Sequence, residues 1–273
     1  ETCPDIAMLL VLFVNGRTAT TPLVFEILPS HVSSLAAFVE HTEALVGKPQ
    51  RGQLYQPAGF FTSRGDRFLN SQTLLQASLV FMMEGGQWIW PGVRIGHEVS
   101  FSGLRSPGET TTIRTVSLVP AVFEIENFLQ SMESAHIIDK VKNSIQKSPV
   151  ALKDADKGKE AKEFRTSSQR FLPTQGDPIL EVVDARVQDL TRIPITHAED
   201  IQVLRYNLKE HYSAHHDFFD PAAYKKDRAI LDMIQDGATN RMATVFFYLT
   251  NVTRGGETNF PQAGGLPAPR DFF

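Results

Sequence analysis

Apolar residues change their spacing along the chain, and each spacing predicts a different element. Residues 6–14 are almost uninterruptedly apolar, which predicts a buried strand. A helix is expected after Pro29-Ser30, with Ser30 as its N-cap, because apolar residues then recur at roughly helical intervals. The apolar positions of this helix are Val32, Leu35, Ala36, Val39, Leu45 and Val46.

A second apolar run covers residues 77–83 and ends at Gly85-Gly86. Trp88 and Trp90 follow, and they could form an exposed binding patch or a small core; aromatic clusters mostly pack, so we expect a core. Residues 103–112 are rich in Gly, Ser, Pro and Thr, which is typical of a linker. We therefore predict a smaller N-terminal α/β region over residues 1–112, to which the sequence assigns no function.

The remainder, residues 113–273, begins with helical patterns and then changes period. Amphipathic helices are predicted over 128–145 and 177–190, separated by a charged, solvated loop over 151–163. Strands are predicted over 202–208, 212–219 and 242–249. Helices followed by a run of strands indicate helices packed against the outside of a β-sandwich or barrel, so the fold class is mixed α+β. The helical apolar positions are Phe128, Leu129, Met132, Ile137, Ile138 and Val141 in the first helix and Ile179, Val182, Val183, Val187 and Leu190 in the second.

The composition limits the kinds of binding partner that are expected, but it does not indicate the cellular compartment. A formal net charge of −4 gives no support to a nucleic-acid partner, which needs a basic patch. The single cysteine, Cys3, allows no intrachain disulfide, and such a chain suits either redox compartment. The apolar run 6–14 is too short to cross a bilayer and lacks a basic flank, so no membrane segment is expected in the chain, and a signal or anchor would lie upstream.

His215 and Asp217 are the candidate chemical centre. Alternate residues of a strand point to the same face, so both side chains can reach one metal ion, whereas His216 points to the other face. One imidazole and one carboxylate, completed by a second imidazole, form the facial triad of non-haem iron(II) oxygenases. His211 shares this face, but four strand residues separate it from His215 by about 13 Å, which is too far for one metal.

The sequence around this pair resembles the prolyl 4-hydroxylases over about residues 117–261. Six ordered stretches carry the resemblance: Leu118-Val-Pro-Ala-Val-Phe123 with Asn127-Phe-Leu129; Phe164-Arg-Thr-Ser-Ser168 with Phe171-Leu172; Ile193-Pro194, Glu199 and Gln202-Val-Leu-Arg-Tyr206; Tyr212-Ser-Ala-His-His-Asp217; Arg241-Met-Ala-Thr-Val-Phe-Phe-Tyr-Leu249; and Gly255-Gly-Glu-Thr258 with Phe260-Pro261.

The resemblance implies a role for each candidate site residue. His215 and Asp217 would bind iron(II), and Tyr248 would contact the cosubstrate 2-oxoglutarate; an ordinary strand aromatic is the alternative for Tyr248. Tyr212 and Arg241 would bind the peptide near its target proline, although Arg241 could instead form a structural ion pair. Residues 220–240 would form a polar loop over the peptide, and Gly255-Gly256 would make a turn.

The same resemblance implies an activity and a fold. The activity is hydroxylation of peptidyl proline to 4-hydroxyproline with release of succinate and carbon dioxide, with Fe(2+), 2-oxoglutarate and L-ascorbate as cofactors. The fold is a double-stranded β-helix (jelly-roll) domain with flanking helices, and the location is the endoplasmic reticulum or secretory pathway. No histidine follows His216. The expectation is therefore a domain truncated at its C-terminus, whose distal histidine and 2-oxoglutarate-binding lysine would lie beyond Phe273.

Three functional hypotheses remain open on the sequence. The chain could be a fragment of an active prolyl hydroxylase. It could be an inactive module that binds proline-rich peptides through Tyr212 and Arg241. It could also belong to an oxygenase of another substrate, such as lysine or a free amino acid.

Overall fold

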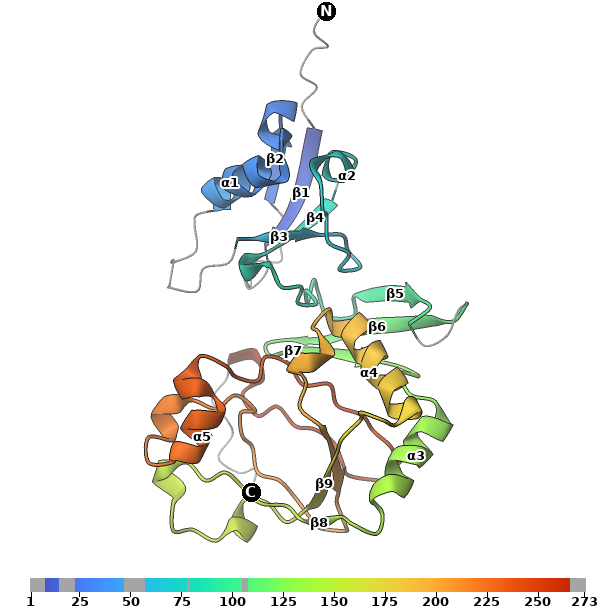
Figure 1. Ribbon diagram of the computed structural model, residues 1–273, viewed down its shortest axis with the longest axis vertical. Helices are drawn as coiled ribbons and strands as arrows, with labels where there is room; N and C mark the ends of the chain where they lie inside the picture. The colour runs from blue at the N-terminus through green and yellow to red at the C-terminus, as the bar shows by residue number, and fades with distance from the viewer. Residues whose placement is uncertain (1–7, 15–22, 47–56, 78, 105–107, 266–273) are drawn as a thin grey trace, which may run out of the picture. The chain divides into compact units, whose positions relative to one another are not determined.

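A computed structural model describes residues 8–14, 23–46, 57–77, 79–104 and 108–265 (Figure 1). Contacts divide the chain into two compact units, the first made of Glu1–Phe128 with Gln188–His197 and the second of Leu129–Val187 with Ala198–Phe273. The fold is mixed α/β with antiparallel strand pairing in both units. The contacts thus divide the chain after Phe128, whereas the assignment of residues 113–273 to a dioxygenase domain stays a prediction.

The first unit contains a four-stranded sheet in the order β2-β1-β4-β3. Strand β1 (Met8–Val14) pairs antiparallel with β2 (Leu23–Ile27) and parallel with β4 (Leu79–Met83), and β4 pairs antiparallel with β3 (Gly59–Phe61). The strands at the centre of the sheet, Met8–Val14 and Leu79–Met83, therefore come from the two apolar runs, whose residues 6, 7 and 78 lie outside the described ranges. The short helix α2 (Ser71–Leu75) begins at Asn70, whose side chain accepts a hydrogen bond from the Thr73 N–H.

Both faces of β4 are buried, which explains its uninterrupted apolar sequence. Val80 and Met82 belong to one core cluster with Phe38, and Phe81 and Met83 belong to another with Trp88. The alternation follows from the two-residue period of a strand. Trp88 is 1% exposed and Trp90 packs against its cluster, which confirms that the two tryptophans form a core.

Helix α1 (Leu35–Val46) begins later than predicted and buries a different stripe. Residues Pro29–Val32 form a 3-10 turn, and the N-cap contact comes from Ser34, whose Oγ accepts a hydrogen bond from the Ala37 N–H at 3.1 Å, so the prediction for Ser30 was wrong. Leu45 is 52% exposed, while Thr42 and Glu43 are buried. These polar residues are tolerated because the Thr42 hydroxyl donates to the Phe38 carbonyl and Glu43 accepts from the Ala58 N–H.

The predicted linker at 103–112 is instead part of a β-hairpin. Strands β5 (Glu98–Ser102), β6 (Thr110–Leu118) and β7 (Ala121–Ile125) form an antiparallel sheet. Gly103 takes a φ of +82° and donates its N–H to the Glu109 carbonyl, which turns the chain between β5 and β6. Glycine and proline mark turns as well as linkers, and the following threonines favour strands, so composition alone could not separate the two.

The second unit has a three-stranded sheet with two longer helices. Strand β9 (Ser168–Leu172) lies between β10 (Ile201–Arg205) and β8 (Gln146–Lys147), with antiparallel pairing on both sides. Figure 1 shows α3 (Ser131–Val141) and α4 (Pro178–Thr191) beside each other. The core of this unit consists of Ile137, Val141, Leu180 and Val203, with Leu129, Leu172, Ile201 and Leu249 packed around them.

In both helices, a residue that was predicted to lie on the buried apolar face is exposed. Met132 on α3 is 60% exposed and Val182 on α4 is 53% exposed. A buried ion pair between Glu133 and Arg186 takes inward-facing positions instead. Helix α3 ends at Val141, short of the predicted residue 145, and the charged segment 151–163 is mostly exposed, as expected.

The segments 212–219 and 242–249 are not strands, which corrects the prediction. A strand requires a ladder of hydrogen bonds to a neighbour, and within the described ranges the first segment forms a single bridge, Arg165 to Tyr212, and the second forms none. The alternation of more and less exposed residues nevertheless persists along 244–249. Residues 220–240 also contain ordered turns and the short helix α5 (Arg228–Met233).

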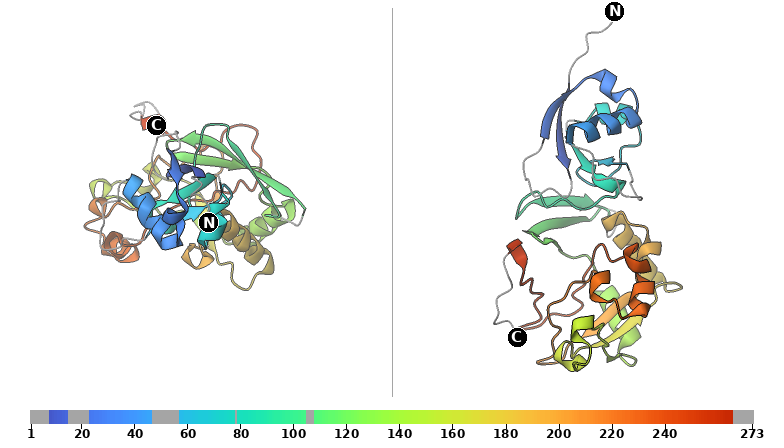
Figure 2. Two further views of the ribbon diagram at one scale, coloured as in Figure 1. Left: turned by 90° about the horizontal axis from the view of Figure 1, so that it is seen from above. Right: turned by 90° about the vertical axis from the view of Figure 1, so that its left-hand side faces the viewer.

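Figure 2 shows the same elements from two further directions. Among the residues that the structure describes, no helix is both long and apolar enough to cross a membrane.

Candidate functional site

The segment that carries His215 is held in place by backbone hydrogen bonds to residues 164–166. The Thr166 N–H donates to the His211 carbonyl at 2.9 Å, and the Ser213 N–H donates to the Phe164 carbonyl at 2.8 Å. The His211 N–H donates in turn to the Thr166 hydroxyl at 2.8 Å. The Phe-Arg-Thr-Ser-Ser segment thereby fixes the backbone two residues before His215.

His215 and Asp217 converge, although the segment that carries them is not the strand on which the prediction relied. His215 Nε2 lies 3.3 Å from Asp217 Oδ1. His215 Nδ1 lies 2.8 Å from the Ser213 carbonyl oxygen, which can only accept, so Nδ1 carries a hydrogen. In the neutral ring, Nε2 then presents its lone pair towards a carboxylate oxygen. Two such lone pairs face each other favourably only with a cation between them, either a proton or a metal ion.

Thr244 holds the other carboxylate oxygen and was missed by the sequence reasoning. Its Oγ1 donates a hydrogen bond of 2.6 Å to Asp217 Oδ2. This contact leaves Oδ1 as the oxygen that faces His215. The only sequence signal for Thr244 is a hydroxyl placed within an apolar run, which is too common to identify a role.

The two site residues shift each other's pKa in opposite directions. The hydrogen bond to Asp217 raises the pKa of His215, against the effect of burial. The hydrogen bond from His215, followed by that from Thr244, lowers the pKa of Asp217 to about 2. Without a metal, both shifts favour the imidazolium–carboxylate form of the pair. Mutual perturbation of this kind is typical of functional sites, although structural ion pairs also produce it.

Within the described part of the chain, no group of three His, Cys, Asp or Glu side chains could hold a metal ion. The His211 ring nitrogens instead lie 3.5 Å from the Thr166 hydroxyl and 3.5 Å from the Glu163 carbonyl oxygen, which agrees with leaving His211 out of the site. His216 is exposed and makes no hydrogen bond to a described residue. The structure thus brings together two candidate ligands.

Tyr212 lies directly against the candidate pair. Its ring is stacked on the His215 imidazole with 3.8 Å between centroids and 23° between planes. The guanidinium carbon of Arg165 lies 4.3 Å from the centroid of the same tyrosine ring. Burial, the largest cause, raises the pKa of the Tyr212 hydroxyl, which keeps it neutral at physiological pH.

Arg241 forms the ion pair that the sequence left as an alternative. Its Nε and Nη2 donate to the two carboxylate oxygens of Glu199 at 2.5 and 2.7 Å. Its guanidinium carbon also lies 5.1 Å from the centroid of the Phe219 ring. The side chain is thus fixed in a two-pronged contact, and peptide binding by Arg241 stays a prediction.

Tyr248 is the most exposed of the predicted site residues, at 63%. Its hydroxyl lies 2.9 Å from the Thr258 hydroxyl, and its ring meets that of Phe246 edge-on at 5.0 Å. The first contact joins the apolar segment 242–249 to the Gly-Gly-Glu-Thr stretch, whose two glycines both take a φ of +81°, as a turn requires. A role in binding 2-oxoglutarate stays a prediction.

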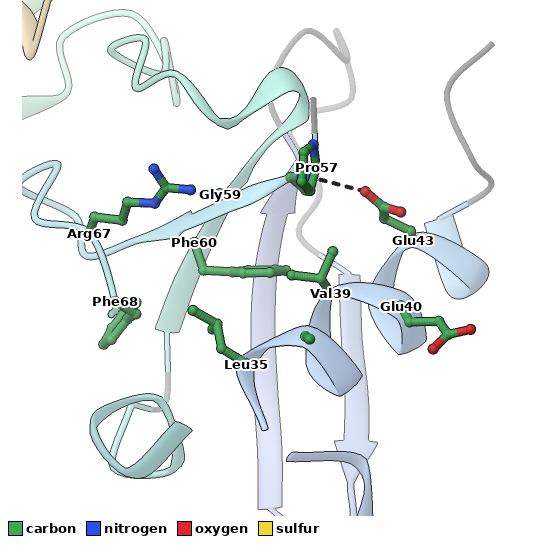
Figure 3. A pocket seen from close by; sticks show the side chains of 11 residues that line it. Leu35, Val39, Glu40, Glu43, Pro57, Gly59, Phe60, Arg67 and Phe68 are labelled. Atoms are coloured by element: carbon green, nitrogen blue, oxygen red, sulfur yellow. Dashed lines mark hydrogen bonds between the residues drawn. The ribbon is translucent and has the colours of Figure 1, made fainter. Parts of the chain in front are cut away.

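A pocket of about 480 Å³ lies in the first unit (Figure 3). Leu35, Val39, Phe60 and Phe68 form its apolar wall, and the charged side chains at its rim include Glu40 and Arg67. None of the sequence-predicted site residues lines it.

An imidazole and a carboxylate two positions apart that converge in this way are typical of non-haem iron oxygenases. Comparisons with known proteins agree with this class. The chain is 38% identical over 151 residues to probable prolyl 4-hydroxylase 4 of Arabidopsis thaliana, which is 55% of this chain and 47% of the relative. It is likewise 38% identical over 152 residues to prolyl 4-hydroxylase 2 and 35% identical over 153 residues to prolyl 4-hydroxylase 5 of the same plant.

The matched part of the chain is similar to prolyl 4-hydroxylases, which confirms the resemblance. The chain spans about half the length of these curated relatives. No profile of a protein family matches it.

Proposed function

We propose that the chain carries part of an iron(II)- and 2-oxoglutarate-dependent dioxygenase that hydroxylates peptidyl proline to 4-hydroxyproline, releasing succinate and carbon dioxide. The observation that carries the proposal is the convergence of His215 Nε2 and Asp217 Oδ1 at 3.3 Å, with the opposite atom of each group already engaged. The prolyl 4-hydroxylases of Arabidopsis thaliana at 35–38% identity support the reaction class.

The residues present fit two of the three expected metal positions. His215 would bind through Nε2, because Nδ1 is occupied by the Ser213 carbonyl. Asp217 would bind through Oδ1, because Oδ2 accepts the Thr244 hydrogen bond. When bound, iron(II) with 2-oxoglutarate supplies the oxidising power for C–H hydroxylation, and ascorbate is the expected reductant. The third ligand would be a further histidine, and among the described residues none lies beside the pair.

The protein's own residues would orient the substrates. Tyr248 would lie beside 2-oxoglutarate, and Tyr212 with Arg241 would bind the peptide around its proline. The Glu199 carboxylate fixes Arg241 in advance, so that little side-chain entropy is lost when a peptide binds. Residues 220–240, with helix α5, would cover the peptide.

The proposed fold of the whole catalytic domain is a double-stranded β-helix. The antiparallel β8–β10 sheet and the persisting alternation along residues 244–249 support it. The family resemblance also leads us to propose a location in the endoplasmic reticulum or secretory pathway.

A second candidate is an inactive module that binds proline-rich peptides. It is favoured by the finding that the described residues contain no group of three metal-binding side chains. Exposed aromatic residues, Phe246 at 54% and Tyr248 at 63%, would suit such a ligand. Under this proposal a proline-rich peptide binds equally well with and without iron.

Succinate formation tests the proposal, measured with iron(II), 2-oxoglutarate and a proline-rich peptide in the intact protein that contains this chain. His215→Ala should abolish succinate formation, since it removes one proposed ligand. His216→Ala is the matched control, because it changes the neighbouring exposed imidazole and should leave turnover unchanged. Full turnover by His215→Ala would mean that the metal is held elsewhere.

A further inference from the structure

The Arg-Thr-Ser-Ser segment carries part of the family resemblance, but the proposed function gives its arginine no role. Arg165 is only 7% exposed, an unusual place for an arginine. Its backbone forms the isolated bridge to Tyr212 that ends three residues before His215. A buried charge so close to the candidate metal pair calls for a physical reason.

Arg165, Tyr212 and His215 lie one upon another. The Arg165 guanidinium carbon lies 4.3 Å from the Tyr212 ring centroid, and the Tyr212 and His215 rings stack at 3.8 Å. We name these three groups the Arg165 stack. Groups this close are in van der Waals contact, so tilting one of them requires its neighbour to move.

Arg165 is the fixed end of the Arg165 stack. Its Nε donates to the Ser167 hydroxyl at 3.0 Å, and its Nη1 donates to the Pro149 carbonyl at 3.3 Å. Nη2 is buried and has no hydrogen-bond partner among the described residues. The tyrosine ring lies within the range at which an aromatic face attracts a cation, so it compensates part of the buried charge.

His215 is the end that needs this support. A single hydrogen bond, from Nδ1 to the Ser213 carbonyl, orients its ring apart from the contact with Asp217. One hydrogen bond fixes the position of Nδ1 but leaves the ring free to swing about it. The face of Tyr212 restricts that swing and keeps Nε2 aimed at the position in front of Asp217 Oδ1.

From these contacts we infer that Arg165 is a positioning residue, which holds the ring of Tyr212 and through it the plane of the His215 imidazole. The contacts themselves do not depend on the proposed function; only the reason for positioning His215, which is metal binding, rests on it. A flat, two-pronged guanidinium is required. A lysine ammonium is a point charge that cannot lie face to face with the tyrosine ring while also reaching Ser167 and Pro149.

Proton NMR of the histidine rings tests the inference in the metal-free chain. The ring current of Tyr212 displaces the chemical shifts of the His215 ring protons. Tyr212→Leu removes the ring current and so measures this displacement. We expect Arg165→Lys and Arg165→Gln to lose most of the same displacement. Arg170→Lys changes an exposed arginine of strand β9, outside the Arg165 stack, and should leave it unchanged. The signals of His136, which lies in the α3 region, report whether each variant is folded.

The inference is overturned if both Arg165 variants are folded and keep the full displacement. It would then follow that Tyr212 stays in place unaided. Should Arg165→Gln fail to fold, Arg165→Lys, which retains the charge, decides the question alone.

Cobalt(II) titration separates this result from the fate of the proposed function. Cobalt(II) affinity should fall severalfold in Arg165→Lys, less than the roughly 10–100-fold loss typical of residues bonded directly to a ligand. His215→Ala sets the background. If the unchanged chain binds cobalt(II) no better than His215→Ala, the proposed metal site is wrong, while the NMR comparison still decides the role of Arg165.

Discussion

Glu133 on α3 and Arg186 on α4 form a two-pronged ion pair inside the second unit. Arg186 Nη1 and Nη2 donate to the two carboxylate oxygens at 2.9 and 2.8 Å, and the side chains are only 2% and 6% exposed. Each charge is tolerated in the interior because the other neutralises it. The pair therefore joins the two helices at a position where an apolar contact would be expected.

Removing one member of this pair should be costly. Arg186→Met removes the cation that neutralises the buried Glu133 carboxylate and leaves it the Gln130 N–H, so we expect the free energy of unfolding to fall by about 3–5 kcal/mol. The double variant Glu133→Leu with Arg186→Met should recover most of the loss, since no charge then stays buried. Urea unfolding followed by circular dichroism measures both. An Arg186→Met loss below about 1 kcal/mol would show that the carboxylate does not need a neutralising cation.

Thr244 offers a test by isosteric replacement. Thr244→Val removes the hydroxyl that donates to Asp217 Oδ2 and keeps the shape, so the pKa of Asp217 should rise from about 2 towards its ordinary 3.8. Thr244→Ser retains the hydroxyl and should keep the low pKa. A carbon-13 NMR titration of the Asp217 carboxyl group measures the difference. Identical titrations for Thr244→Val and Thr244→Ser would show that the hydroxyl does not lower the pKa of Asp217.

The pH dependence of the His215–Asp217 pair follows from the two shifts. The raised pKa of His215 contributes stability that is complete below 6.5 and is lost as pH rises through the folded-state value. The lowered pKa of Asp217 contributes stability that is complete above 3.8 and is lost as pH falls towards about 2. The metal-free pair thus stabilises the fold most between pH 3.8 and 6.5.

Comparing the unfolding free energy of the native chain with that of His215→Gln across pH checks this window. The difference between the two proteins should be largest inside it and shrink on both sides. The affinity for a metal ion should fall as the pH falls, because protons compete with the metal for His215 Nε2. Cobalt(II) affinity that is independent of pH between 5 and 8 would contradict the assignment of Nε2 as a ligand.

Gly65 and Gly96 form a matched pair in the first unit. Both have positive φ values, +80° and +78°. A Cβ on Gly65 would lie 2.7 Å from the Trp88 indole, whereas a Cβ on Gly96 would meet nothing within 4 Å. Gly96→Ala should cost about 1–2 kcal/mol from backbone strain alone. Gly65→Ala should cost about 1–3 kcal/mol more from overpacking.

Chemical denaturation followed by tryptophan fluorescence compares the two glycine variants, since Trp88 and Trp90 both lie in the first unit. Equal losses would mean that the Trp88 ring moves aside freely, against its close packing with Phe61 and Phe81.

The sequence predicted what depends on near neighbours and failed on what depends on distant ones. The apolar runs identified β1 and β4, and the two-residue spacing of His215 and Asp217 predicted that they converge. The inward-facing Glu133 and Arg186 could not be predicted, because each is buried only by virtue of a partner 53 positions away.

The same limit applies to the site. Thr244 lies 27 positions from Asp217, and Arg165 reaches His215 only through Tyr212, so no local pattern shows either contact. The missing ladders of residues 212–219 and 242–249 have the same origin. Alternation predicts which side chains share a face, but a ladder also needs a neighbouring strand, which alternation does not supply.

The central place of β1 in its sheet has a consequence for how the chain is made. β1 is synthesised before one of its two neighbours, β4, which begins only at Leu79. At 5–20 residues per second, a ribosome needs about 3–13 s to pass from Val14 to Leu79. Throughout that interval one edge of the apolar strand β1 has no neighbouring strand to pair with. Chaperones near the ribosome therefore have time to shield it.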